Sequence, residues 1–273
     1  MAWQVGYLQT LATHGIRLDT ADRVVGTSAG SLVASSLTSG KLKRLHAEVS
    51  VLAKVPAIVS ALAPASKLQP SQERALDLFL RATDSEPATV QEIGRAALAA
   101  ATPRPEVTRR NLSLVVGPGR LSSPTLQITC VDAYTGERCV ATHRSGTTMA
   151  RAAAASSAVP GIFAPQLIGD RRCMDGGVSG TGIHLDLLAG AGRVLILALT
   201  DGNDATEGMM TMHPDDGRKE LEDLEKSGTD VVLRVPEQVD MMELMSPAVV
   251  PAALAMGARQ AGADIGLIST FWS

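Results

Sequence analysis

A serine flanked by glycines is the first place in this chain where chemistry is expected. Gly26-Thr27-Ser28-Ala29-Gly30 is a G-x-S-x-G pattern between a β-branched stretch and an apolar stretch with helical character. In that setting a sharp turn holds the serine in a strained backbone conformation and projects its hydroxyl above the sheet. Side chains at Gly26 and Gly30 would collide with the neighbouring strand and helix, and the helix that starts at Ala29 directs N–H groups toward a developing oxyanion. The pattern predicts Ser28 as a nucleophile.

Because glycine and serine are common in strand-to-helix turns, the assignment needs a second residue. Asp175-Gly176-Gly177 lies 175 − 28 = 147 residues further on, directly after a predicted strand over 171–174. The two glycines allow this turn to approach another turn closely. A partly desolvated Asp175 has a raised pKa and can accept the serine proton without an imidazole between them. This predicts a Ser-Asp dyad, whereas the alternative is a Gly-Gly turn with a solvated carboxylate.

The elements predicted around these turns alternate between helices and strands. Helices are expected over 3–14, 31–37, 89–101, 147–157 and 215–226, and strands over 23–25, 112–116, 126–131, 138–142, 194–199 and 231–235, with two short strands on either side of residues 169–170. Residues 41–110 are expected to form a helical insert or cap, and 194–235 a βαβ unit. This predicts a single α/β domain over 1–273, a three-layer α/β/α sandwich with a mostly parallel sheet.

Charge and composition limit the partners. Lys and Arg total 25 and Asp and Glu total 28, which gives a net charge of −3, and aromatic residues make up only 3% of the chain. A nucleic acid is not an expected partner, because there is no basic excess and few rings can stack on bases. No run approaches the ~20 apolar residues of a membrane span, but this leaves open a peripheral contact with a membrane surface.

The three cysteines indicate a reducing cytoplasm, because their number is odd and no signal-peptide pattern begins the sequence. Cys130 and Cys139 are expected on the two arms of a hairpin. Small apolar packing is favoured for them over a redox or metal role, since ligand spacing and a partner histidine are both missing. The histidines are not spaced as a metal pair either. We expect neither a metal nor another cofactor.

Three segments taken together resemble the patatin-like phospholipase family. They are the residues 3–8 of the first helix, the elbow at 26–30, and the stretch Ala155-Ser-Ser-Ala-Val-Pro-Gly-Ile-Phe163 that leads into Asp175-Gly176-Gly177. They occur in the family's order and cover most of the chain. The resemblance implies a three-layer α/β/α fold, Ser28 as nucleophile, Asp175 as base, and acyl esters of lipids as substrates.

The sequence departs from the family pattern in two places. Family members begin with a strand and a G-G-G-x-[RK]-G loop whose N–H groups form the oxyanion hole, whereas this sequence starts at Met1, just past where that loop would end. We therefore expect weak activity and a first helix whose N-terminal N–H groups point toward the region above Ser28. The alternative is a catalytically impaired protein that binds lipid. The second departure is at 180–182, where many members carry an asparagine.

A Ser-His-Asp esterase is the rival hydrolase, and it needs a histidine late in the chain. His184 and His213 are possible by position. His213 lies among polar residues and His184 precedes an ordinary helical stretch, so both are interpreted as surface or capping residues.

Overall fold

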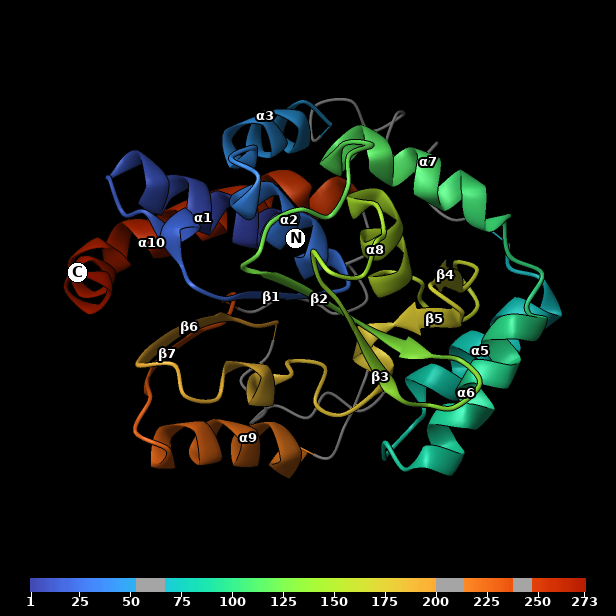
Figure 1. Ribbon diagram of the computed structural model, residues 1–273. Coiled ribbons are helices and arrows are strands. Elements are labelled where there is room, and N and C mark those ends of the chain that lie inside the picture. The colour runs from blue at the N-terminus through green and yellow to red at the C-terminus, as the bar shows by residue number, and fades with distance from the viewer. Residues whose placement is uncertain (53–66, 200–213, 238–246) are drawn as a thin grey trace.

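The computed structural model of the chain describes residues 1–52, 67–199, 214–237 and 247–273 (Figure 1). Its helices are α1 (Ala2–Thr13), α2 (Ala29–Thr38), α3 (Leu42–Leu52), α5 (Pro70–Leu80), α6 (Pro87–Ala99), α7 (Pro105–Val116), α8 (Met149–Ser156), α9 (Pro214–Lys226) and α10 (Val250–Trp272). Its strands are β1 (Val24–Thr27), β2 (Leu126–Asp132), β3 (Arg138–Ala141), β4 (Gln166–Ile168), β5 (Arg171–Asp175), β6 (Arg193–Leu197) and β7 (Asp230–Arg234). Short 3₁₀ turns are η1 (Leu18–Thr20), η2 (Gly176–Val178), η3 (Leu185–Leu188) and η4 (Pro247–Val249). The fold is α/β, as predicted.

Strand β2 is the centre of a five-stranded sheet. It runs parallel to β1 and antiparallel to β3 and β5, and β4 pairs antiparallel with β5. Strand β3 pairs with residues 128–131 along one edge of β2, so β1 and β5 share the other edge, at 126–129 and 130–132. The prediction of a mostly parallel sheet is wrong, because the hairpin around residues 169–170 brings β5 back in the opposite direction.

Strands β6 and β7 form a separate two-stranded parallel sheet, with α9 between them in the sequence. This confirms the βαβ unit. Val194 and Ile196 pack with Leu224 of α9, and Leu195 and Leu197 pack against the core that α1 and α10 share. Both faces of this sheet are covered, as the continuous apolar runs predict.

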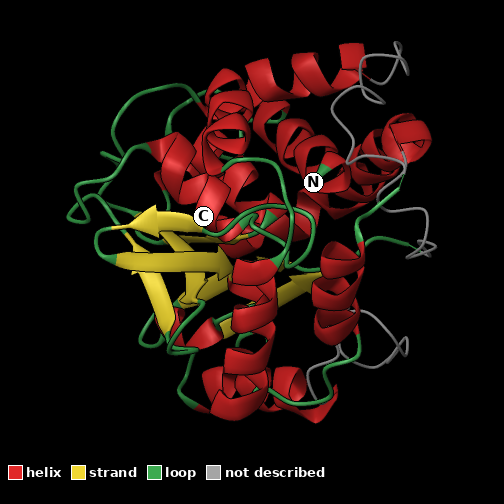
Figure 2. Ribbon diagram, turned by 90° about the vertical axis from the view of Figure 1, so that its right-hand side faces the viewer, coloured by secondary structure: helices red, strands yellow, loops and turns green. Residues whose placement is uncertain are grey.

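Helices cover both faces of the five-stranded sheet (Figure 2). Leu126 and Ile128 of β2 pack against α2 and α8, whereas Val131 of β2 and Met174 of β5 pack against α5 and α6. The alternation follows from the period of two along a strand. Helix α1 crosses α10 closely at Gly6, which has no side chain. A Cβ at this position would collide with the α10 backbone. Ser28 and Asp175 therefore follow strands of a sheet that is packed on both sides.

The described part of residues 41–110 is helical, but it does not pack as one unit. Helix α3 joins the core of α1 and α10, while α5 and α6 belong to the core beside Met174. Whether the segment acts as a cap stays a prediction.

The predicted strand over 112–116 is wrong, because these residues form the last turns of α7. The helix predicted to begin at Thr89 begins at Pro87 instead. Among the residues that the structure describes, no helix has the length and apolar character needed to cross a membrane.

Candidate active site

The turn between β1 and α2 is strained at Ser28. This residue has φ 50° and ψ −129°, and its positive φ is shared by only one other described non-glycine residue, His184. Gly26 is required by packing, since a Cβ there would lie 2.8 Å from both Ala34 Cβ and Ser31 Cα. At Gly30 the nearest atom to a Cβ would be 3.9 Å away. The predicted collision is therefore found at Gly26 but not at Gly30.

Hydrogen bonds hold the strained serine from both sides. Ser31 donates to the Ser28 carbonyl oxygen from its N–H at 2.9 Å and from its hydroxyl at 2.6 Å. The Ser28 N–H donates to the hydroxyl of Ser156 on α8 at 2.8 Å. No local sequence signal indicates this role of Ser156, although the residue lies in the stretch 155–163 that carries the family resemblance. These contacts offset the strain at the turn.

The carboxyl ends of β1 and β5 meet at the same place on the sheet. The two strands share one edge of β2 and run toward each other, so β1 ends at Thr27 and β5 ends at Asp175 near Thr129 and Cys130. The hydroxyl of Ser28 consequently donates to Asp175 Oδ2 at 2.7 Å. The structure thus brings the two predicted residues together from positions 147 residues apart.

Asp175 is enclosed, whereas Ser28 is partly accessible. The Asp175 residue is 1% exposed, and its second oxygen, Oδ1, accepts a hydrogen bond from the Gly177 N–H at 2.8 Å. Burial raises the pKa of Asp175 to about 6, while the Gly177 N–H and the Ser28 hydroxyl act in the opposite direction. A carboxylate with that pKa is a stronger base than an ordinary aspartate, and it is still ionised at neutral pH.

Gly176 allows the Asp175 turn to lie against β2. A Cβ on Gly176 would lie 2.7 Å from both the carbonyl oxygen and the hydroxyl oxygen of Thr129. The Thr129 hydroxyl is also 2.7 Å from that of Thr27, in the elbow. Asp175 itself is fixed by a hydrogen bond from its N–H to the Ala158 carbonyl oxygen at 3.0 Å.

Gly176→Ala is expected to destabilise the fold by about 1–3 kcal/mol, because the added methyl group must push the turn away from β2. The same displacement lengthens the Ser28–Asp175 hydrogen bond, so reaction at Ser28 should fall as well. Urea unfolding measures the first effect. Gly192→Ala is the matched control, since a Cβ at Gly192 meets no atom within 4 Å. Equal stability of the two variants would contradict the packing argument.

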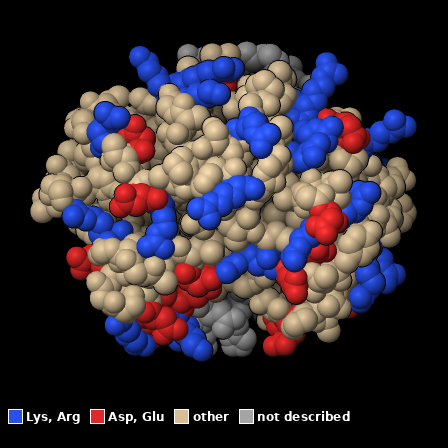
Figure 3. All heavy atoms as spheres, viewed as in Figure 1, with Lys and Arg blue, Asp and Glu red and all other residues tan. Residues whose placement is uncertain are grey.

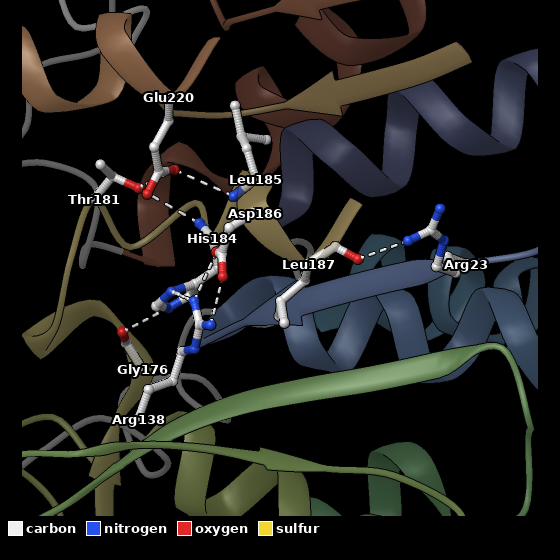
Figure 4. Close-up of polar contacts among 9 residues, drawn as sticks. All are labelled: Arg23, Arg138, Gly176, Thr181, His184, Leu185, Asp186, Leu187 and Glu220. Atoms are coloured by element: carbon white, nitrogen blue, oxygen red, sulfur yellow. Dashed lines mark hydrogen bonds and ion pairs between the residues drawn. The ribbon is translucent and has the colours of Figure 1, made fainter. Parts of the chain in front are cut away.

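His184 contacts Gly176, the residue after Asp175 (Figure 4). Its ring nitrogen Nε2 lies 3.0 Å from the Gly176 carbonyl oxygen, and its Nδ1 lies 3.4 Å from Arg138 Nη1. A carbonyl oxygen can only accept, so Nε2 carries the proton and Nδ1 accepts from Arg138. Burial lowers the pKa of His184 to about 4, which keeps the ring neutral at pH 7. His184 occupies the N-cap position of η3, which confirms the interpretation as a capping residue, although its side chain makes no cap hydrogen bond. It is only 1% exposed, so the surface interpretation is wrong.

Charged residues tie this support to the rest of the fold. Arg138 of β3 makes a two-pronged ion pair with Asp186, at 2.7 and 2.5 Å. Glu220 of α9 accepts from the Thr181 hydroxyl at 2.7 Å and from the Leu185 N–H at 3.2 Å. The loop after Asp175 is thus attached to both β3 and α9.

The rival Ser-His-Asp arrangement has no support among the described histidines, none of which hydrogen bonds Ser28 or Asp175. His213 lies outside the described residues. Within the described ranges, no three side chains of His, Cys, Asp or Glu are placed to hold a metal ion.

Helix α1 begins beside the elbow, as Figure 1 shows near the chain start. Gln4 in its first turn is the neighbour closest to a Cβ at Gly30, and its amide donates to the Leu197 carbonyl oxygen at 2.9 Å. Whether the first N–H groups of α1 point above Ser28 stays a prediction.

The α/β fold thus places a strained serine at a strand-to-helix turn, with a buried aspartate hydrogen bonded to it. The family model of patatin-like phospholipases matches residues 1–185. The chain belongs to the patatin-like phospholipase family.

Solved structures add a distant similarity. The crystal structure of the type III effector protein ExoU covers 97% of this chain at 15% identity, with a TM-score of 0.34. The match covers 50% of the effector, so the chain spans half of that protein's length. No curated protein sequence matches the chain.

Proposed function

We propose that this protein is a lipid acyl hydrolase that cleaves acyl esters through Ser28 and Asp175. Family membership supports the reaction class, since patatin-like phospholipases act on lipids. The observation that carries the proposal is the 2.7 Å hydrogen bond from the strained Ser28 to a buried carboxylate. The proposal includes the three-layer α/β/α arrangement, with helices packed on both faces of the sheet.

In the acylation step the Ser28 oxygen attacks the ester carbonyl carbon while its proton moves to Asp175 Oδ2. The carbonyl oxygen becomes an oxyanion. We assign one of its donors to the N–H of Ala29, because the first N–H groups of α2 have no carbonyl within their own helix and the helix dipole favours negative charge there. The alcohol half of the lipid leaves with the proton from Asp175, and the acyl chain stays on Ser28.

In the second step a water molecule attacks the acyl carbonyl carbon. Asp175 accepts one proton of the water and returns it to the Ser28 oxygen, so that the fatty acid is released and the dyad is restored. No histidine takes part. His184 acts only by holding the Gly176 carbonyl, and therefore the turn that carries the base.

Substrate class is tested by offering the protein phospholipid vesicles and a short-chain aryl ester in parallel. Release of fatty acid from the vesicles supports a phospholipase, whereas release of the phenol alone supports a general esterase. If the protein releases neither product but still binds the vesicles, the catalytically impaired lipid-binding protein is favoured instead.

We also propose a peripheral contact with the cytoplasmic surface of a membrane, through α3 and α7. Arg44 of α3 donates to the Leu114 carbonyl oxygen at 3.4 Å, so the two helices lie near each other at this point. They carry the apolar side chains Val51, Leu114 and Val107, which are 59%, 69% and 49% exposed. Lys and Arg side chains project along the same edge of the molecule (Figure 3). Exposed apolar groups beside cations suit an anionic lipid surface.

Leu114→Asp is expected to weaken binding to vesicles of anionic phospholipid about tenfold, since it replaces an inserted apolar group with a repelled charge. Flotation of vesicles with bound protein measures the effect. Leu267→Asp is the matched control, because Leu267 is 48% exposed on α10, outside this surface. If both variants lose vesicle binding equally, α3 and α7 are not the membrane contact.

A further inference from the structure

The three cysteines of the chain converge on neighbouring strands beside the dyad. Cys130 of β2 is the register partner of Cys139 on β3 and, on the opposite edge, of Asp175 on β5. Cys173 lies two residues before Asp175 on the same face of β5. Cys130 thus lies between the strands that carry the other two cysteines, and all three thiols are free. The predicted hairpin already places Cys130 and Cys139 on its two arms, whereas Cys173 joins them only because β5 pairs with β2 in the sheet.

The three thiols differ in access. Cys130 and Cys173 are fully buried, packed against Ala155 of α8, whereas Cys139 is half-buried at the outer strand. A small solute from outside therefore reaches the sulfur of Cys139 first.

Cys139 is also the thiol with a cation beside it. The guanidinium of Arg171 donates to the Cys139 sulfur at 3.4 Å and pairs with Glu137 at 3.2 Å. Hydrogen bonds from Cys130 and Cys173, together with Arg171, lower the pKa of Cys139. The neighbouring thiols of Cys139 and Cys173, together with burial, raise the pKa of Cys130. A thiol that lies beside a guanidinium and directly opposite a second cysteine loses its proton more easily, and the thiolate is the form that reacts with oxidants.

We propose that Cys139 and Cys130 form a peroxide-responsive thiol pair, in which Cys139 reacts first and Cys130 resolves the product. The Cys139 thiolate attacks one oxygen of a hydroperoxide, so an S–O bond forms while the O–O bond breaks. The sulfur loses two electrons and becomes a sulfenic acid on Cys139, and hydroxide is the leaving group. The Cys130 sulfur then attacks the sulfenic sulfur. Loss of the Cys130 proton and the sulfenic hydroxyl as water leaves a Cys130–Cys139 disulfide, which a dithiol can reduce.

Strand geometry selects Cys130 rather than Cys173 as the second thiol. Residues directly opposite each other in antiparallel strands have Cα atoms about 4.5–5.5 Å apart, inside the range that a disulfide spans. Cys139 and Cys173 lie on opposite edges of β2, about two strand spacings or 9–10 Å apart, which exceeds the ~7 Å limit for a disulfide without backbone movement. Cys173 should therefore stay a thiol.

The test is peptide mass spectrometry of the full chain after hydrogen peroxide at pH 7, with free thiols alkylated. The expected result is a peptide pair joined through Cys130 and Cys139, reversed by dithiothreitol, with Cys173 alkylated. In Cys130→Ser, dimedone should capture a sulfenic acid at Cys139. Cys173→Ser should leave the Cys130–Cys139 link intact.

Arg171→Gln should slow oxidation of Cys139 about tenfold by removing the cation beside the thiolate. Arg172→Gln is the matched control, because the next residue on the strand points to the other face. No disulfide in the folded protein, a disulfide through Cys173, or equal rates in both arginine variants would each overturn the proposal. None of these measurements uses the hydrolytic reaction, so their outcome is independent of the proposed function.

Discussion

Ser28→Ala is expected to abolish labelling by a fluorophosphonate probe and to lower ester hydrolysis by at least about a thousandfold. The reason is that the attacking oxygen is removed, and no other described hydroxyl is hydrogen bonded to Asp175. The fold should survive, because the hydrogen bond between the Ser28 N–H and Ser156 does not need the Ser28 side chain. In-gel fluorescence of the labelled protein and the rate of phenol release are the measurements.

The control for this prediction is Ser39→Ala. Ser39 ends the same helix, and its hydroxyl bonds only backbone carbonyl oxygens of α2. Labelling of this variant should equal that of the unmodified chain. Labelling that persists at full intensity in Ser28→Ala would remove Ser28 as the site of attack.

The elbow was predictable because its chemistry is local. A strand, a turn with Gly26 and Ser28, and a helix lie within 15 residues, so the pattern of residue types fixes the conformation. Asp175 was predictable by its Gly-Gly turn and by the family's order of motifs. The distance between the two residues was not, since it depends on β1 and β5 sharing one edge of β2, which is a property of the whole sheet.

Two errors have specific physical causes. Residues 112–116 contain consecutive β-branched and apolar side chains, which favoured a strand, yet the more buried positions Thr108, Leu112 and Val116 are four apart, as on a helix. The sheet was predicted mostly parallel although a hairpin between residues 126–131 and 138–142 was expected, and that hairpin already requires two antiparallel strands.

The supporting residues around the dyad carry no local signal. His184 is buried because the chain takes a left-handed conformation there and turns the ring toward Gly176. Its partner Arg138 lies 46 residues earlier, on β3. The residues around these two positions are typical of an ordinary surface loop, so only the assembled fold reveals that they support the turn after Asp175.

Asp175→Asn is expected to lower kcat/KM by about a thousandfold while leaving the protein folded, because the amide oxygen can still accept from Gly177 but cannot take the serine proton. His213→Ala, the change that would disable a Ser-His-Asp enzyme, should keep most of the activity. If His213→Ala loses as much activity as Asp175→Asn while both remain folded, a histidine is the base and the dyad proposal fails.

The pH profile gives an independent test of the same residue. The base acts in its ionised form, and burial raises the pKa of Asp175 to about 6. The value of kcat/KM should therefore rise about tenfold per pH unit below pH 6 and level off above it. An aspartate at the ordinary value of 3.8 would give a flat profile from pH 5 to 8. The residual activity of Asp175→Asn should lose the rise near pH 6, because the group that titrates there is gone. If kcat/KM of this variant still rises near pH 6, another group titrates there. The raised pKa of Asp175 would then not explain the pH dependence of the reaction at Ser28.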